Sequence, residues 1–102
     1  MIRHLVFWHF QALNGESKNA VLGDIRHKIT DAMRAVGGAE LKHFGMIRRE
    51  NSCFNLVLDS VFVNHEHLTA YMHHPIHKQA VTVLRERTSE KEIIDYEYDT
   101  SA

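Results

Sequence analysis

The hydrophobic pattern begins with a stretch that is apolar on both sides. Residues 2–10 are rich in β-branched and aromatic types at both sets of alternating positions. One set is Ile2, Val6, Trp8 and Phe10, and the other includes Leu5 and Phe7. This pattern predicts a strand that is buried on both sides, followed by a polar turn at residues 11–16.

The period changes between residues 17 and 36, where apolar residues recur at steps of three and four. The repeating positions are Val21, Leu22, Ile25, Ile29, Met33 and Val36. This spacing predicts an amphipathic helix. Ser17 is a suitable N-cap, and Gly37-Gly38 can end the helix because glycine adopts a left-handed conformation without steric cost.

Two further strands are predicted in the middle of the chain, over residues 39–49 and 53–63. In the second strand, one face carries Phe54, Leu56, Leu58 and Phe62, and the other carries Val57 and Val61 with Asn55 and Asp59. Glu50-Asn51-Ser52 lies between the two strands and predicts a hairpin turn.

The last third of the chain predicts two short helices and a final strand. Asn64 is a suitable N-cap for the first helix. Pro75 fits the first turn of the second helix, because the N–H that proline lacks has no helical partner there. We expect this second helix to reach about Thr88 and the final strand to cover residues 91–99.

The predicted order of elements is strand, helix, strand, strand, helix, strand. This is an α+β, ferredoxin-like plan in a single domain of residues 1–102, with a four-stranded antiparallel sheet and helices on one face. Because the first strand is apolar on both sides, the uncovered face of the sheet is too apolar to remain in water. We therefore predict a homodimer in which two sheets pack face to face.

Composition and charge narrow the class of protein. Twelve Lys and Arg against thirteen Asp and Glu argue against a nucleic-acid partner. The single cysteine, Cys53, excludes an intramolecular disulfide and a cysteine-based zinc site, and it favours a cytoplasmic location. No apolar run is long enough for a membrane span, the N-terminus lacks the cleavage site of a signal peptide, and no glycine-rich phosphate-binding motif is present. We expect neither a membrane partner nor a cofactor.

Histidine is the unusual residue type. Five of the nine histidines lie between His65 and His77. His73 and His77 are four residues apart, a spacing that can share a metal ion on a continuous helix, but Pro75 lies between them and interrupts the helix. We interpret the cluster as solvated and free of metal.

Several stretches resemble the stress-responsive dimeric A/B barrel family. They are residues 2–6, 55–62, 70–77 and 94–96. The most specific stretch is similar to the family's Tyr-x-x-His-Pro-x-His motif, here Tyr71-Met72-His73-His74-Pro75-Ile76-His77. The resemblance implies a ferredoxin-like subunit whose sheet pairs with that of a second copy into a dimeric α+β barrel. It also implies a cavity between the sheet and the helices.

The same resemblance implies candidate site residues. A plant member of the family is a cofactor-free, aldol-type cyclase of a linear polyketide, and its functional residues fall on His4, Tyr71 and His77 of this chain. That cyclase also has a histidine on its third strand, where this chain has Leu56. The polar lining of the cavity is therefore incomplete here, which puts the same reaction in doubt.

Two of these residues suggest chemistry without reference to the family. Tyr71 and His77 lie on either side of Pro75, and a bend there can turn both side chains toward one point. A histidine near a helix N-terminus favours its neutral form, which can remove an acidic C–H proton. The Tyr71 hydroxyl can donate to the resulting enolate oxygen, and His4 can orient either group. In the alternative interpretation, His77 bonds to backbone at a helix start and Tyr71 serves packing.

The sequence leaves three functions open. The first is a homodimer that binds a small, largely apolar molecule near His4, Tyr71 and His77. The second is a cofactor-free cyclase or isomerase that uses the same three residues as catalytic groups. A cofactor-free monooxygenase is related to it, although no residue favours oxygen chemistry. The third is a stress-associated dimer without a ligand, whose interior would be filled by side chains.

Overall fold

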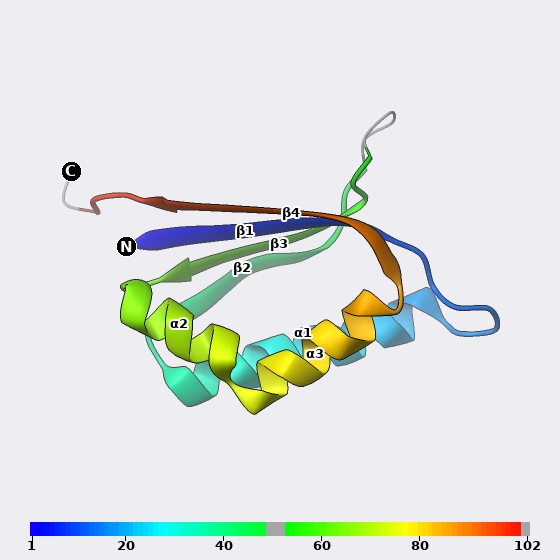
Figure 1. The fold of residues 1–102 in the computed structure, drawn as a ribbon, viewed down its shortest axis with the longest axis horizontal. Helices are drawn as coiled ribbons and strands as arrows, with labels where there is room; N and C mark the ends of the chain where they lie inside the picture. The colour runs from blue at the N-terminus through cyan, green and yellow to red at the C-terminus, as the bar shows by residue number, and fades with distance from the viewer. Residues whose placement is uncertain (49–52, 101–102) are drawn as a thin grey trace.

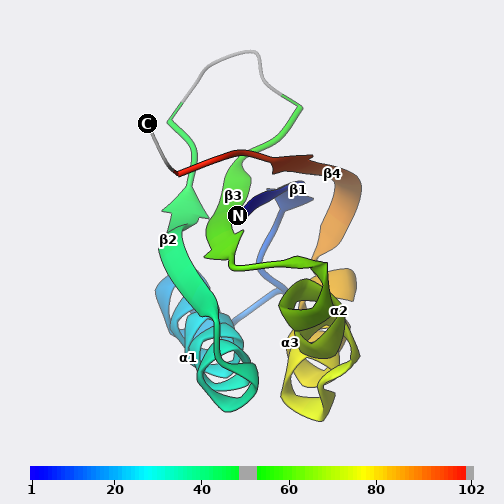
Figure 2. The ribbon, with the colours of Figure 1, turned by 90° about the vertical axis from the view of Figure 1, so that its left-hand side faces the viewer.

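The computed structural model describes residues 1–48 and 53–100. The elements are β1 (Ile2–Phe10), α1 (Lys18–Val36), β2 (Ala39–Met46), β3 (Leu56–Phe62), α2 (His65–His73), α3 (Pro75–Arg85) and β4 (Thr88–Glu97). The strands form a four-stranded sheet in the order β2-β3-β1-β4, and all neighbouring strands are antiparallel. The helices form a layer on one face of this sheet (Figures 1 and 2). The predicted α+β, ferredoxin-like fold is confirmed.

The helix boundaries follow from local capping, as predicted. The Ser17 hydroxyl accepts a hydrogen bond from the Ala20 N–H at 3.3 Å, which satisfies a free donor at the start of α1. Gly37 ends this helix at a φ of 69°, a conformation that favours glycine. The Asn64 side chain caps α2 by accepting a hydrogen bond from the His67 N–H at 3.0 Å.

The core lies between the sheet and the helix layer. Its buried apolar residues are Ile2, Val6, Trp8, Phe10, Ile25, Ile29, Ala32, Met33, Phe44, Leu56, Leu58, Phe62, Leu68, Tyr71, Ala80 and Leu84. Along β1 the residues alternate between buried and half-buried, beginning with a buried Ile2. The even-numbered residues of β1 therefore face the helices, and the odd-numbered ones face the opposite side of the sheet.

The junction between α3 and β4 differs from the prediction. α3 ends at Arg85 instead of continuing to Thr88, and β4 already begins at Thr88 rather than at residue 91. Arg87 accounts for the difference, because its guanidinium pairs with Glu16 at 2.7 and 2.8 Å and also donates to the Val83 carbonyl at 2.8 Å. These contacts hold Arg87 in a turn between the end of α3 and the start of β4.

The hairpin strands are shorter than predicted. β2 ends at Met46 and β3 begins at Leu56. Just before β3, the Asn55 side chain exchanges two hydrogen bonds with the Phe10 backbone, at 2.6 and 2.9 Å. Phe54 therefore lies outside the alternation of β3. Its ring contacts Phe7 on the outer face, with 6.0 Å between centroids, so its predicted place on the face of Leu56 is wrong. The turn predicted at residues 50–52 lies outside the described residues.

The sheet face that points away from the helices is rich in apolar side chains. It carries Leu5, Phe7, Val57, Ile94 and Tyr96. Ile94 is 45% exposed and Tyr96 is 47% exposed. An ion pair between Arg3 and Asp59 crosses the same face, with a shortest distance of 2.5 Å. In residues 1–48 and 53–100, none of the helices is long and apolar enough to cross a membrane.

Candidate functional site

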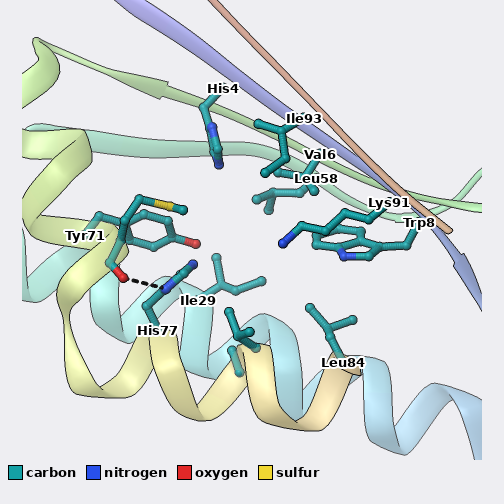
Figure 3. Close-up of a pocket in the computed structure, with 13 residues that line it drawn as sticks. His4, Val6, Trp8, Ile29, Leu58, Tyr71, His77, Leu84, Lys91 and Ile93 are labelled. Atoms are coloured by element: carbon teal, nitrogen blue, oxygen red, sulfur yellow. Dashed lines mark hydrogen bonds between the residues drawn. The ribbon is translucent and has the colours of Figure 1, made fainter. Parts of the chain in front are cut away.

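A cavity of about 190 Å³ lies between the sheet and the helices (Figure 3). Its lining residues are His4, Val6, Trp8, Ile29, Leu58, Tyr71, Met72, His77, Ala80, Val81, Leu84, Lys91 and Ile93. All three site residues proposed from the sequence, His4, Tyr71 and His77, are therefore brought together at one cavity. Most of the remaining lining is aliphatic, so the cavity has apolar walls with a few polar groups.

The break between α2 and α3 positions Tyr71 and His77. His74 is extended, with φ −67° and ψ 137°, because a residue before proline disfavours the helical conformation. Its Nδ1 accepts a hydrogen bond from the Ile76 N–H at 3.1 Å, which caps α3. The resulting bend brings the rings of Tyr71 and His77 to 4.5 Å between centroids, at a steep angle. The bend predicted at Pro75 is thus present, and it turns both side chains toward the cavity.

The hydrogen bonding of His77 defines which nitrogen faces the cavity. Nδ1 lies 3.1 Å from the Met72 carbonyl, which can only accept, so Nδ1 carries the proton in the neutral ring. Figure 3 shows this bond, with the rest of the ring directed into the cavity. Nε2 is left as an acceptor that can bind a ligand N–H or O–H, or take a proton.

Burial lowers the pKa of His77 from its ordinary 6.5 to about 4. The hydrogen bond to Met72 opposes this shift, and the charges of His4, Lys91 and His74 add to it. The direction agrees with the expectation from the helix N-terminus, but the largest cause is the loss of water around the imidazole. His77 is therefore neutral at pH 7.

Acidification from pH 6.5 to pH 4 should destabilise the fold through His77. In this window an unfolded chain protonates this histidine while the folded chain does not, so the free energy of unfolding falls as the pH falls. Urea denaturation at pH 7 and pH 4.5 tests this. We expect a smaller loss of stability in His77→Gln than in the wild type. His27→Gln, which changes a side chain that is 75% exposed, should follow the wild type. Equal losses in all three proteins would contradict the assignment.

Tyr71 forms the wall of the cavity next to His77. The residue is only 1% exposed, and its ring packs against Phe62 with 5.1 Å between centroids. Burial raises the pKa of the Tyr71 hydroxyl, so the group stays protonated and can donate a hydrogen bond. Figure 3 places this hydroxyl at the cavity, beside the His77 ring.

Asp95 is a polar residue of the site that the sequence analysis did not assign. It lies opposite His4 in the pairing of β1 with β4, and its Oδ1 is 2.5 Å from His4 Nδ1. The His4 side chain is only 3% exposed, whereas that of Asp95 is 39% exposed. Since the carboxylate accepts, Nδ1 of His4 carries a proton and the opposite edge of the ring faces the cavity (Figure 3).

Lys91 and Trp8 also line the cavity and were not predicted as site residues. They lie opposite each other in β4 and β1, so their side chains share the face that points toward the helices. The sequence pattern predicted Trp8 only as an apolar residue of a strand buried on both sides, and it gave Lys91 no role. The third strand contributes Leu58 to the lining, and Leu56 is fully buried in the core, so this wall is apolar.

The other histidines of the cluster have separate local partners. His65 pairs with Glu97 at 2.8 Å, His67 bonds to the Gly37 carbonyl at 2.8 Å, and His73 bonds to the Thr69 carbonyl at 2.9 Å. No group of three or more His, Cys, Asp or Glu side chains in the described part of the chain is arranged to hold a metal ion.

This chain matches one protein-family model and is similar to several solved structures. The model of a family described as "Stress responsive A/B Barrel Domain" matches residues 2–98. A dimeric protein of unknown function with a ferredoxin-like fold from Bacteroides fragilis is 22% identical, with a TM-score of 0.74 over 95% of each chain. A comparison with curated proteins gave no match.

Two further solved structures are similar. A dimeric ferredoxin-like protein of unknown function from a Jannaschia species is 19% identical, with a TM-score of 0.72 over 95% of this chain and 98% of that one. A protein of Arabidopsis thaliana is 20% identical, with a TM-score of 0.71 over 100% of this chain and 99% of that one. At these identities the structural matches establish a common fold.

Proposed function

Because this chain belongs to the stress-responsive A/B barrel domain family, we propose that it is a homodimer that binds a small, largely apolar molecule between its sheet and helices. The observation that carries the proposal is the cavity of about 190 Å³ with aliphatic walls and inward-facing Tyr71 and His77. An interior filled by side chains would instead have favoured a dimer without a ligand.

The size and lining of the cavity indicate the kind of molecule that fits. An apolar cavity of about 150 Å³ can hold benzene, so this cavity suits a molecule of about that size or slightly larger. Its polar groups are few and grouped, as in many small-molecule sites. The Tyr71 hydroxyl donates, and His77 Nε2 accepts, so a carbonyl or hydroxyl on the ligand can bond there.

The proposed homodimer uses the outer face of the sheet. Ile94 and Tyr96 are both nearly half exposed there, and they lie next to further apolar side chains of β1 and β3. Packing of this face against a second copy would remove the apolar surface from water. The similar proteins from Bacteroides fragilis and Jannaschia are both described as dimeric, which supports the same arrangement here.

A ketone probe such as 2-heptanone tests the binding site. We expect Tyr71→Phe to weaken binding about five- to tenfold, because a hydrogen bond to the carbonyl oxygen is lost. His77→Ala should also lower the affinity for the probe. Tyr96→Phe and His27→Ala make matched changes away from the cavity and should bind as the wild type does. Calorimetric titration measures all five proteins, and unchanged affinity in both cavity variants would refute this site.

A second candidate function is a cofactor-free cyclase or isomerase. The 4.5 Å contact between the Tyr71 and His77 rings favours it, because it places a base beside a hydrogen-bond donor. His77 Nε2 would take a C–H proton, and the electron pair would move onto a carbonyl oxygen bonded to Tyr71. In a cyclase, the enolate carbon would then attack a second carbonyl carbon, and His77 would give its proton to the alkoxide oxygen that forms. In an isomerase, His77 would return the same proton to a different carbon.

We rank ligand binding above catalysis as the function because the pKa of His77 is lowered. A value of about 4 makes the imidazole a weak base near neutral pH. If the protein is an enzyme, His77→Gln should lower turnover about 10²- to 10⁴-fold while the substrate still binds. Comparable turnover in this variant would exclude His77 as the base.

A further inference from the structure

Lys91 is the cation of the cavity. It lies on β4 directly opposite Trp8, and its side chain is exposed and lines the cavity. Figure 3 shows the ammonium group directed away from the strand and toward the space between His77 and Ile93. A lysine here is unexpected, because the surrounding wall is formed by residues such as Val6 and Leu84.

The protein provides no counter-charge for Lys91 in the described residues. Among residues 1–48 and 53–100, no carboxylate oxygen lies within the 4.0 Å of an ion pair from Lys91 Nζ. Glu90 and Glu92 alternate to the other face of the strand. Asp95 shares the face of Lys91 but bonds to His4 at the far end of the cavity.

A second cation lies next to the same end of the cavity. An adjoining cavity of about 90 Å³ is lined by Trp8, Val81, Leu84, Arg85, Thr88 and Lys91. Four of these residues also line the larger cavity, so the two spaces are neighbours. Arg85 and Lys91 therefore both line this smaller cavity, where an anion would meet two positive groups.

We propose that the bound molecule is an organic acid, with its carboxylate at Lys91 and Arg85 and its apolar part in the larger cavity. This inference rests on the proposed function and names the class of its ligand. A lysine ammonium and an arginine guanidinium both form charge-assisted hydrogen bonds with a carboxylate. The apolar part extends from there toward Tyr71 and His77.

The position of Lys91 also sets the spacing of polar groups on the ligand. Lys91 and Asp95 are four residues apart on β4, which at about 3.3 Å per residue separates them by about 13 Å. The acid is therefore at one end of the cavity, and the pair of His4 and Asp95 is at the other. A short chain or a small ring that carries a carboxylate fits the cavity of about 190 Å³, with any second oxygen at the end near Tyr71.

Octanoate and 1-octanol form a matched pair of probes, because they differ only at the polar end. Trp8 is the one tryptophan of the sequence and lies opposite Lys91, so its fluorescence reports binding at this end. We expect the wild type to bind octanoate about five- to tenfold more tightly than 1-octanol at low salt. Added salt should reduce this preference, since the cations are exposed to solvent.

Substitutions of Lys91 and Arg85 test whether these two cations cause the preference for octanoate over 1-octanol. Lys91→Met should reduce the preference for octanoate over 1-octanol, and Lys91→Met combined with Arg85→Met should remove it. Lys78→Met removes the same charge from the exposed side of α3 and should keep the wild-type preference.

The outcomes separate this inference from the function on which it rests. Equal binding of both probes to the wild type, or a preference that survives in the double variant, would overturn the acid assignment and leave the cavity as a binding site. If neither probe binds to the wild type, the proposed function fails, and the inference fails with it.

Discussion

Substitution of Val81 by tryptophan is expected to weaken binding of a small apolar molecule by at least about 100-fold. Val81 is half-buried on α3 and lines both neighbouring cavities. An indole at this position would occupy much of the 190 Å³ that the ligand needs. The ligand would lose most of its apolar contact, and each 1.4 kcal/mol of lost binding energy is a factor of ten in affinity.

The neighbouring residue provides the control for this substitution. Thr82 is exposed on the outer side of α3, so Thr82→Trp adds the same ring away from the cavity. Titration with 2-heptanone should show wild-type affinity for Thr82→Trp and almost none for Val81→Trp. Circular dichroism checks that both variants are folded, and Val81→Phe offers a smaller change if the tryptophan disturbs packing. Full affinity in folded Val81→Trp would show that the ligand binds elsewhere.

Substitution of Ile94 by aspartate is expected to convert the protein to a monomer. Ile94 is 45% exposed on the outer face of the sheet in the single chain, so the charge can remain hydrated in a monomer. In a symmetric dimer the same change buries two carboxylates without partners, a cost of several kcal/mol. Dimerisation should therefore weaken by more than about 100-fold.

Ile93 is the matched control for Ile94. It is 40% exposed and adjacent in the chain, but it faces the helices and lines the cavity instead of the outer face. Analytical ultracentrifugation at micromolar concentration should find dimers for the wild type and for Ile93→Asp, and monomers for Ile94→Asp. A wild-type monomer under these conditions, or a dimer that tolerates Ile94→Asp, would place the interface elsewhere or remove it.

The fold was predictable because its signals are local in the sequence. Ser17, Asn64 and Pro75 mark helix starts within a few residues of the elements that they begin. The end of α3 was not predictable in this way. It depends on the contact of Arg87 with Glu16, which is 71 residues away in the chain. A sequence pattern of period 3.6 or 2 carries no information about such a partner.

The candidate site was predictable only in part, for the same reason. Tyr71 and His77 are close in sequence, and Pro75 between them predicted the bend that brings their rings together. Lys91 reaches the cavity, and Asp95 reaches His4, only because β4 pairs with β1 in a particular register. A shift of that register by one residue would turn both side chains to the other face of the sheet. Their roles therefore required the strand pairing to be known.

The most direct test of a ligand cavity between the sheet and the helices is a methyl NMR titration of the wild-type protein with 2-heptanone. The methyl groups of Ile29, Leu58 and Ile93 line the cavity, whereas those of Leu5, Val57 and Ile94 lie on the outer face of the sheet. We predict saturable shifts in the first set and small ones in the second. Saturable shifts confined to the outer face, or no saturable shift at all, would contradict the proposed function.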